Sequence, residues 1–211
     1  MKEMLYKLCQ DAFNEAYKQS NLYQQSEEFK EIESNKSLQI LHAQRSRYWI
    51  ESLAEILLVY IRENYIQEHE YSAFYRGNQE NRKFLGLNEF LFDIVVARMR
   101  EFITARDSQN SEPKFEKLKA IEQIVWLVES EFQLKNSKAL LIDMNKLAVG
   151  KAKNKLFVMS LDIGSNINQW AEKMLSELTK GDDANIYLAK IPHPANWEKT
   201  TSSDMLILQI S

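Results

Sequence analysis

The sequence predicts an α/β protein with a mixed central sheet, flanked by helices and preceded by a helical N-terminal extension. Three observations lead to this fold class. The chain of 211 residues contains only 5 Gly and 3 Pro, so long helices joined by few loops are expected. Its first third carries apolar residues at helical spacing. The remainder alternates short runs of branched and aromatic residues with amphipathic stretches, which favours a sheet with helices packed on it.

Two helices are expected in the N-terminal third. Residues 2 to about 20 and residues 38 to 66 place apolar side chains three and four positions apart, as one face of a helix requires. The polar residues 21–37 between them predict either a loop or a solvated helical stretch. Cys9 lies on the apolar side of the first helix, and we interpret it as part of the core. A single cysteine cannot form an internal disulfide, which is typical of a reducing compartment.

The rest of the chain is expected to supply the sheet. Branched and aromatic content predicts strands over residues 71–76, 90–98, 124–132, 156–161, 186–191 and 205–210. Helices are expected over 138–151, with Ser137 as the N-cap, and from Gly164 to Gly181. Residues 106–113 are interpreted as a polar loop, and 113–121 as one or two helical turns. Without a repeat or a linker, the expectation is one domain over 1–211, with a helical extension over 1–44 and an α/β core over 45–211.

Charge and hydropathy limit the classes of partner. The formal net charge is −3, which argues against a broad electrostatic surface for nucleic acid but permits a local basic patch. The longest apolar segment, residues 53–61, contains Glu55 and is too short to cross a bilayer. The N-terminus shows no secretory pattern. We therefore expect a cytoplasmic protein without a membrane partner.

Three carboxylates stand where apolar strands are expected. Alternate side chains of a strand share a face, so Glu129 and Glu131 are expected to lie together, with their Cα atoms about 6.5–7 Å apart. Asp93 interrupts the apolar run over residues 90–96. Buried acids are costly without compensation. Because neighbouring strands lie about 4.8 Å apart, we expect these three side chains to converge on one Mg²⁺ or Mn²⁺ ion, which prefers oxygen ligands.

This spacing resembles the PD-(D/E)XK superfamily, the restriction-endonuclease-like fold of many restriction and repair nucleases. The core of that family runs from a helix, through a hairpin bearing an Asp and a strand bearing (D/E)-X-K, to a helix and a further strand. The resemblance covers about residues 45–161. It implies that Asp93 takes the place of the family Asp and Glu129 that of the first acid in the strand motif. Glu131 stands where the family usually has Lys, a Glu-X-Glu variant, and Lys146 on the following helix would replace that lysine.

The resemblance also has departures and consequences. Phe92, not Pro, precedes Asp93. The family's helical Glu is either Glu51 or Glu55, and Glu55, which lies among apolar residues, is favoured. The function implied is Mg²⁺-dependent hydrolysis of phosphodiester bonds in nucleic acid, with DNA favoured over RNA.

A local excess of basic residues follows the acidic strand. Between residues 135 and 155 six lysines stand against the single acid Asp143, a local charge of +5; they are Lys135, Lys138, Lys146, Lys151, Lys153 and Lys155. This predicts a basic rim that attracts a phosphate-bearing substrate to the metal site. The alternative is an ordinary solvated helix end.

Every candidate residue also has a structural interpretation. Glu129 and Glu131 could face solvent on an edge strand, and Asp93 could pair with Arg98 or another base. Lys146 could pair with Asp143, and Glu51 and Glu55 could be helix-surface acids. The corresponding alternative function is a non-catalytic binding or assembly protein that retains a nuclease-like core. Its aromatic-rich helices could then mediate a homodimer. The acidic charge balance, the long N-terminal helical layer and the lysine missing from the strand favour this alternative.

Overall fold

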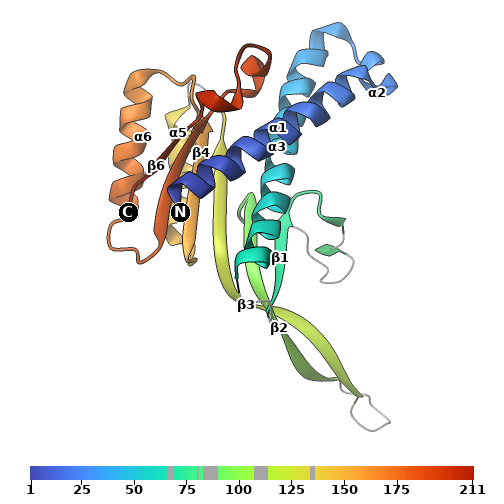
Figure 1. The fold of residues 1–211 in the computed structure, drawn as a ribbon, viewed down its shortest axis with the longest axis vertical. Coiled ribbons are helices and arrows are strands. Elements are labelled where there is room, and N and C mark those ends of the chain that lie inside the picture. Colours follow the sequence, from blue (N-terminus) through green and yellow to red (C-terminus); the bar gives the residue numbers. More distant parts are fainter. Residues whose placement is uncertain (66–68, 80, 83–89, 107–113, 134–135) are drawn as a thin grey trace.

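The sheet runs through the centre of the molecule (Figure 1). The computed structural model describes residues 1–65, 69–79, 81–82, 90–106, 114–133 and 136–211. Their strands are β1 (Glu70–Tyr75), β2 (Ile94–Arg106), β3 (Lys114–Glu131), β4 (Asn154–Ser160), β5 (Asn185–Ile191) and β6 (Leu206–Gln209). They follow one another in the order β1-β2-β3-β4-β5-β6. Strands β3, β4 and β5 are parallel, and the other neighbours are antiparallel. The predicted mixed sheet is confirmed.

Helices pack on both faces of this sheet. The helical elements are α1 (Lys2–Gln25), α2 (Glu27–Lys30), α3 (Ser34–Asn64), α5 (Ser137–Val149) and α6 (Ser165–Leu178), with 3-10 turns η1 (Pro194–Lys199) and η2 (Ser202–Asp204). Helices α1 and α3 contribute to the core on one face, and α5 and α6 to the core on the other. In the described ranges, no helix has the length and apolar character needed to cross a membrane.

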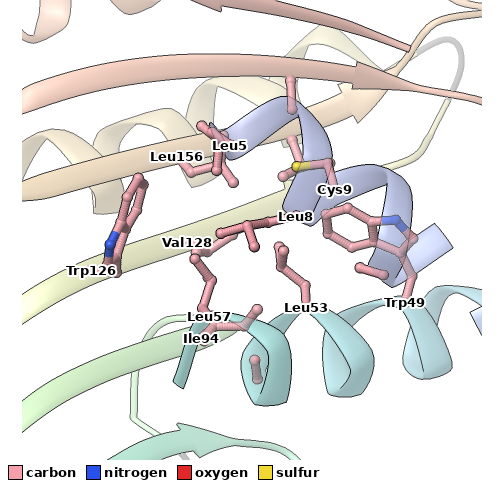
Figure 2. Close-up of a cluster of buried hydrophobic side chains, with 14 of the residues drawn as sticks. Leu5, Leu8, Cys9, Trp49, Leu53, Leu57, Ile94, Trp126, Val128 and Leu156 are labelled. Atoms are coloured by element: carbon pink, nitrogen blue, oxygen red, sulfur yellow. The ribbon is translucent and has the colours of Figure 1, made fainter. Parts of the chain in front are cut away.

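The core on the α1 and α3 face is built from large apolar side chains. Figure 2 shows Leu8 and Cys9 of α1 and Trp49 and Leu53 of α3 gathered in one core with Val128 of the sheet. Cys9, Trp49 and Leu53 are fully buried, which confirms the interpretation of Cys9 as part of the core. Each large apolar side chain buried in this way contributes roughly 1.5–3 kcal/mol through the hydrophobic effect.

The opposite face holds a second core, which positions the candidate site. Its buried helical residues are Leu140, Met144, Leu147, Ala171 and Leu175. Helix α5 crosses from β3 to the parallel strand β4, so its first residues lie at the carboxyl end of β3. The side chain of Asn136 accepts a hydrogen bond from the Ala139 N–H at 3.1 Å. Asn136, rather than the predicted Ser137, is therefore the N-cap of α5.

The N-terminal helices are longer than predicted. Of the two interpretations of residues 21–37, the helical one is confirmed for most positions, because α1 continues to Gln25 and α3 begins at Ser34. The Gln, Glu and Lys residues in this region have high helix propensity, which a polar composition alone conceals. Helix α3 runs across the expected boundary between residues 44 and 45.

Strands β2 and β3 continue beyond the rest of the sheet as a two-stranded arm (Figure 1). The helical turns predicted over 113–121 are wrong, because β3 begins at Lys114 and pairs with β2 along this stretch. Cross-strand charge pairs accompany the pairing, such as Lys117 Nζ with a Glu101 carboxylate oxygen at 2.8 Å. The predicted loop overlaps β2 at Arg106, and residues 107–113 lie outside the described residues.

The arm leaves the sheet at two irregularities in strand pairing. The register of β2 and β3 shifts between Val96 and Ala97 and again two residues later. Each shift places an extra residue on β3, first Val125 and then Glu122. As a result the sequence neighbours Val125 and Trp126 both enter the same core. Such bulges increase the local twist and bend the strand pair.

Gly77, in the turn after β1, has a backbone that other residues rarely adopt. Its φ is 104°, and a Cβ there would lie 2.6 Å from Glu51 Oε1, which is engaged by Arg47 at 2.8 Å. We expect Gly77→Ala to lower the free energy of unfolding by about 1–2 kcal/mol. Urea denaturation followed by circular dichroism measures this loss.

A second glycine provides the matched control. Gly181 has φ 82°, and a Cβ added there meets nothing within 4 Å. Gly181→Ala therefore tests the backbone conformation without the steric contact. It should lower the free energy of unfolding by less than Gly77→Ala does. Equal losses at the two positions would show that the approach to Glu51 has no energetic consequence.

Candidate carboxylate site

The candidate acids lie where β2 begins and β3 ends. Asp93 directly precedes β2, and Glu129 and Glu131 are in the last three residues of β3. Ile94 pairs with Val128, so the two segments are adjacent. Because β3 lies between β2 and β4, it is an inner strand, and the alternative that Glu129 faces solvent on an edge strand is wrong. The structure therefore brings Asp93 to the Glu-Ser-Glu segment.

Asp93 is held by Ser130, the middle residue of that segment. Its Oδ2 accepts hydrogen bonds from the Ser130 backbone N–H at 2.8 Å and the Ser130 hydroxyl at 2.6 Å. Burial raises the pKa of the Asp93 carboxyl, and these two hydrogen bonds act in the opposite direction. Arg98, the alternative partner considered from the sequence, instead pairs with Glu122 at 2.9 Å. Sequence reasoning missed Ser130, since a lone serine gives no signal in an apolar strand.

Glu129 is the most unusual side chain of the site. It is 1% exposed, and its Oε1 has no hydrogen-bond partner among the described residues. Its Oε2 lies 3.5 Å from Lys146 Nζ. Burial raises the pKa of Glu129 to about 8, the charge of nearby Asp93 adds to this effect, and the ammonium of Lys146 opposes it. A buried oxygen without a partner is costly, so this position favours a proton or a cation.

Helix α5 supplies the positive charge and one further acid. Lys146 Nζ lies 2.6 Å from Asp143 Oδ1, which confirms the predicted pairing, and the same ammonium reaches Glu129. Desolvation lowers the pKa of Lys146, but the hydrogen bond to Asp143 and the charge of Glu129 outweigh it, so the pKa is raised. Residues three apart on a helix share a face. Asp143 was therefore a recognisable neighbour of Lys146, but sequence reasoning missed it as a site residue.

Glu131 lies at the rim of the cluster. Its Oε1 accepts the backbone N–H of Gln133 at 2.7 Å. Burial raises the pKa of the Glu131 carboxyl, the hydrogen bond from Gln133 opposes this, and the charges of Asp143 and Asp93 raise it further. Among the described residues, four acids therefore gather around Lys146, and we call Asp93, Glu129, Glu131, Asp143 and Lys146 the carboxylate cluster.

The structure does not bring Glu55 to the carboxylate cluster. Glu55 lies on α3, on the other side of the sheet from α5, and accepts a hydrogen bond from the Tyr75 hydroxyl at 2.6 Å. Both residues line a polar cleft of about 570 Å³ between α3 and β1. Glu51 pairs with Arg47 on the same helix. Neither glutamate occupies the place that the resemblance implies for the helical Glu.

Only part of the predicted basic rim lies at the cluster. Lys146 contacts Glu129, and Lys138 is exposed in the first turn of α5 at the carboxyl end of β3, whereas three other described lysines lie elsewhere. Lys155 is buried and pairs with Asp182 at 2.5 Å. Lys151 and Lys153 precede β4 and so lie toward the opposite end of the sheet from Glu131. Lys135 lies outside the described residues. The count of charges along the chain did not reveal at which end of the strands each lysine would stand.

A groove opens beside the cluster at the carboxyl ends of β3 and β5. Its volume is about 480 Å³, and its lining includes His42, Asp93, Ser130, Glu131 and His193. One wall comes from α3 and the other from the ends of the two strands. We call it the carboxyl-edge groove. It gives solvent and small ligands access to the rim of the carboxylate cluster.

The fit of the cluster to a divalent cation is partial. Among the described residues, no three His, Cys, Asp or Glu side chains are arranged to hold a metal ion, so the expected convergence of three acids is not present in this conformation. The donor chemistry does suit a hard cation, because Glu129 offers an unpartnered oxygen near Asp93. Mg²⁺ is commonly held by one or two carboxylates, with water completing its coordination.

Comparison with known proteins adds no assignment to these residues. The chain has no significant match among protein family models, curated proteins or solved structures. A role for the carboxylate cluster therefore has to follow from its own geometry and chemistry.

Proposed function

We propose that the protein is a Mg²⁺- or Mn²⁺-dependent phosphodiesterase that acts on nucleic acid, with DNA favoured over RNA, at the carboxylate cluster. The observation that carries this proposal is Glu129, a buried carboxylate with one oxygen unpartnered among the described residues and with Asp93 nearby. A cation bound between these two acids would compensate both the missing partner and the repulsion.

The residues of the cluster take distinct roles in this proposal. Asp93 and Glu129 would hold the ion, and Ser130 fixes the orientation of Asp93 through its two hydrogen bonds. When bound, Mg²⁺ supplies an activated water and neutralises charge on a phosphate. Lys146, with its ammonium 3.5 Å from Glu129, would contribute positive charge for the attacking water or the phosphate. Glu131 would complete the water shell of the ion from the rim.

The order of elements supports the proposed likeness to PD-(D/E)XK nucleases. Helix α3 is followed by the antiparallel strands β1, β2 and β3, then by α5 and by β4, which is parallel to β3. This is the order of helix, hairpin, motif strand, helix and strand that the resemblance implies. The contact between Lys146 on α5 and Glu129 on β3 supports the proposed replacement of the strand lysine.

Two observations favour a second candidate, a non-catalytic binding or assembly protein that retains this core. Lys146 already compensates part of the charge of Glu129, and three of the lysines expected in the basic rim lie elsewhere, with Lys155 buried against Asp182. This candidate would place a second copy of the chain at an apolar depression of about 510 Å³ between α1 and α3, whose lining includes Met4, Val59 and Tyr60.

Cation-dependent melting and cleavage distinguish the two candidates. We expect Mg²⁺ or Mn²⁺ to raise the melting temperature of the wild-type protein, because a ligand at 100 times its dissociation constant adds about 2.7 kcal/mol of stability. The same ions should support cleavage of a panel of single-stranded DNA, duplex DNA and RNA. Asp93→Asn and Glu129→Gln are expected to remove both effects.

The matched control is Glu177→Gln, which alters an exposed acid on α6 outside the cluster and should leave both effects unchanged. A wild-type protein that shows neither a cation-dependent melting shift nor cleavage would exclude the phosphodiesterase. Light scattering coupled to size-exclusion chromatography then tests the second candidate, which requires a dimer.

A further inference from the structure

The carboxyl-edge groove contains two histidines that the proposed function does not use. Its volume of about 480 Å³ lies within the range of roughly 300–1,000 Å³ that is typical of small-molecule sites. His42 of α3 and His193, which follows β5, both line it, and their ring centroids are 6.5 Å apart. Their hydrogen bonding differs, and that difference separates a structural histidine from one available to a ligand.

His193 is occupied by its own loop. Its ring Nδ1 accepts the backbone N–H of Ala195 at 3.1 Å, as the N-cap of η1, and its backbone N–H donates to Asp162 at 2.9 Å. Burial lowers the pKa of His193, while Asp162 and a hydrogen bond to the backbone of Phe132 act in the opposite direction. These contacts explain His193 as a structural residue in the wall of the groove.

His42 has no such anchoring. None of the described residues forms a hydrogen bond with its ring nitrogens, and its ring packs edge-on against that of His193. Burial lowers the pKa of His42, and the positive charge of Arg45, one helical turn away, lowers it further. An imidazole carries at least one N–H donor in either protonation state. Because His42 lines the groove together with Asp93 and Glu131, such a donor is available there.

The rest of the lining has the mixed character that a nucleotide requires. Ser46, Ser130 and Gln133 are polar, whereas Ile50 and Phe132 provide apolar surface suited to a sugar or a base. The acids of the groove would repel a bare phosphate, so an anion can enter only together with a cation. This pattern suits one nucleotide of a nucleic acid strand better than it suits a free inorganic anion.

We propose that the carboxyl-edge groove binds one nucleotide of the substrate strand in a Mg²⁺-dependent manner, and that His42 donates a hydrogen bond to its phosphate. This inference rests on the proposed phosphodiesterase function and adds to it the subsite and a specific substrate contact. It makes His42 a binding residue on a different element from the carboxylate cluster.

The direct test is nuclear magnetic resonance of the histidine rings in the intact wild-type protein. The probe is a dithymidine phosphorothioate, which resists hydrolysis, added with and without Mg²⁺. We expect the His42 ring resonances to shift only when Mg²⁺ is present. His69 lies near Arg98 of β2 and does not line the groove, so its resonances should not shift. A probe that leaves the His42 resonances unchanged overturns the inference.

Variants provide a second readout. His42→Phe keeps an aromatic ring but has no N–H donor, so it should weaken binding of the dinucleotide at least roughly tenfold through loss of the hydrogen bond to the charged phosphate. His69→Phe is the matched control and should bind as the wild type does. Equal affinity of the His42→Phe and wild-type proteins shows that the proposed contact is absent.

A cleavage assay on the same preparations separates this inference from the proposed function. Cleavage by the wild type without any response of His42 to the probe refutes the subsite and leaves the phosphodiesterase standing. A His42 response with no cleavage of any substrate in the panel refutes the phosphodiesterase and leaves a nucleotide-binding groove.

Discussion

Glu129→Gln is expected to remove a pH dependence of stability that the wild-type protein shows. Burial raises the pKa of Glu129 in the folded state from an ordinary value of 4.5 to about 8. The folded state then binds a proton more tightly than the unfolded state, so the free energy of unfolding falls as the pH rises between these values. The shift corresponds to roughly 4–5 kcal/mol above pH 8. Glutamine does not titrate and avoids this loss.

Urea unfolding at about pH 5 and about pH 9 measures the effect. The variant should gain stability relative to the wild type at the higher pH and not at the lower one. Glu177→Gln, which changes an exposed acid on α6, should follow the wild type at both. Parallel behaviour of the Glu129→Gln and wild-type proteins across this range would contradict the assignment. If the cluster binds a cation, added Mg²⁺ should restore wild-type stability at the higher pH, because a metal ligand must be deprotonated.

Asp182→Ala is expected to cost about 3–5 kcal/mol of stability. The side chain of Lys155, in β4, is 1% exposed and pairs with Asp182 Oδ2 at 2.5 Å. Its ammonium also donates to the carbonyl of Ala148 at 3.3 Å. Removing the aspartate leaves a buried positive charge with that carbonyl as its remaining described contact. Urea denaturation followed by circular dichroism measures the loss.

The double variant Lys155→Met with Asp182→Ala is the control for this pair. Methionine has a similar length and no charge, so it fills the same space without needing a partner. Buried ion pairs replaced by apolar residues are often neutral for stability, whereas removal of one partner is not. The double variant should therefore lose much less stability than Asp182→Ala alone. Equal losses would mean that the buried charge is not the cause.

The strands of the parallel half of the sheet could be predicted because strands buried on both faces consist almost entirely of apolar residues. The apolar runs predicted over 156–161 and 186–191 correspond to β4 and β5. The arm could not be predicted in the same way. Its residues are solvated on most sides, and Lys117 and Lys119 give β3 a composition that also suits a helix surface. These residues form a strand because they pair with β2, and that pairing is not visible in a short stretch of sequence.

The candidate site shows the same division between local and non-local information. The alternation of side chains within a strand predicted that Glu129 and Glu131 share a face. The close spacing of neighbouring strands predicted that Asp93 lies near them. The partners that are distant in sequence were not accessible in this way. Ser130 contacts Asp93 across 37 positions of sequence, and Asp182 contacts Lys155 across 27. Such partners depend on which ends of the elements meet, and a count of charges along the chain does not contain that information.

The paired construction of the arm has a consequence for how the protein tolerates changes in length. Residues added to or removed from β2 and β3 in matched numbers, beyond the two bulges, alter the reach of the arm but leave Ile94 opposite Val128. Matched insertions in the arm therefore leave the spacing of Asp93 and Glu129 unchanged. The arm is the natural place to graft a tag or a foreign loop without disturbing the rest of the molecule.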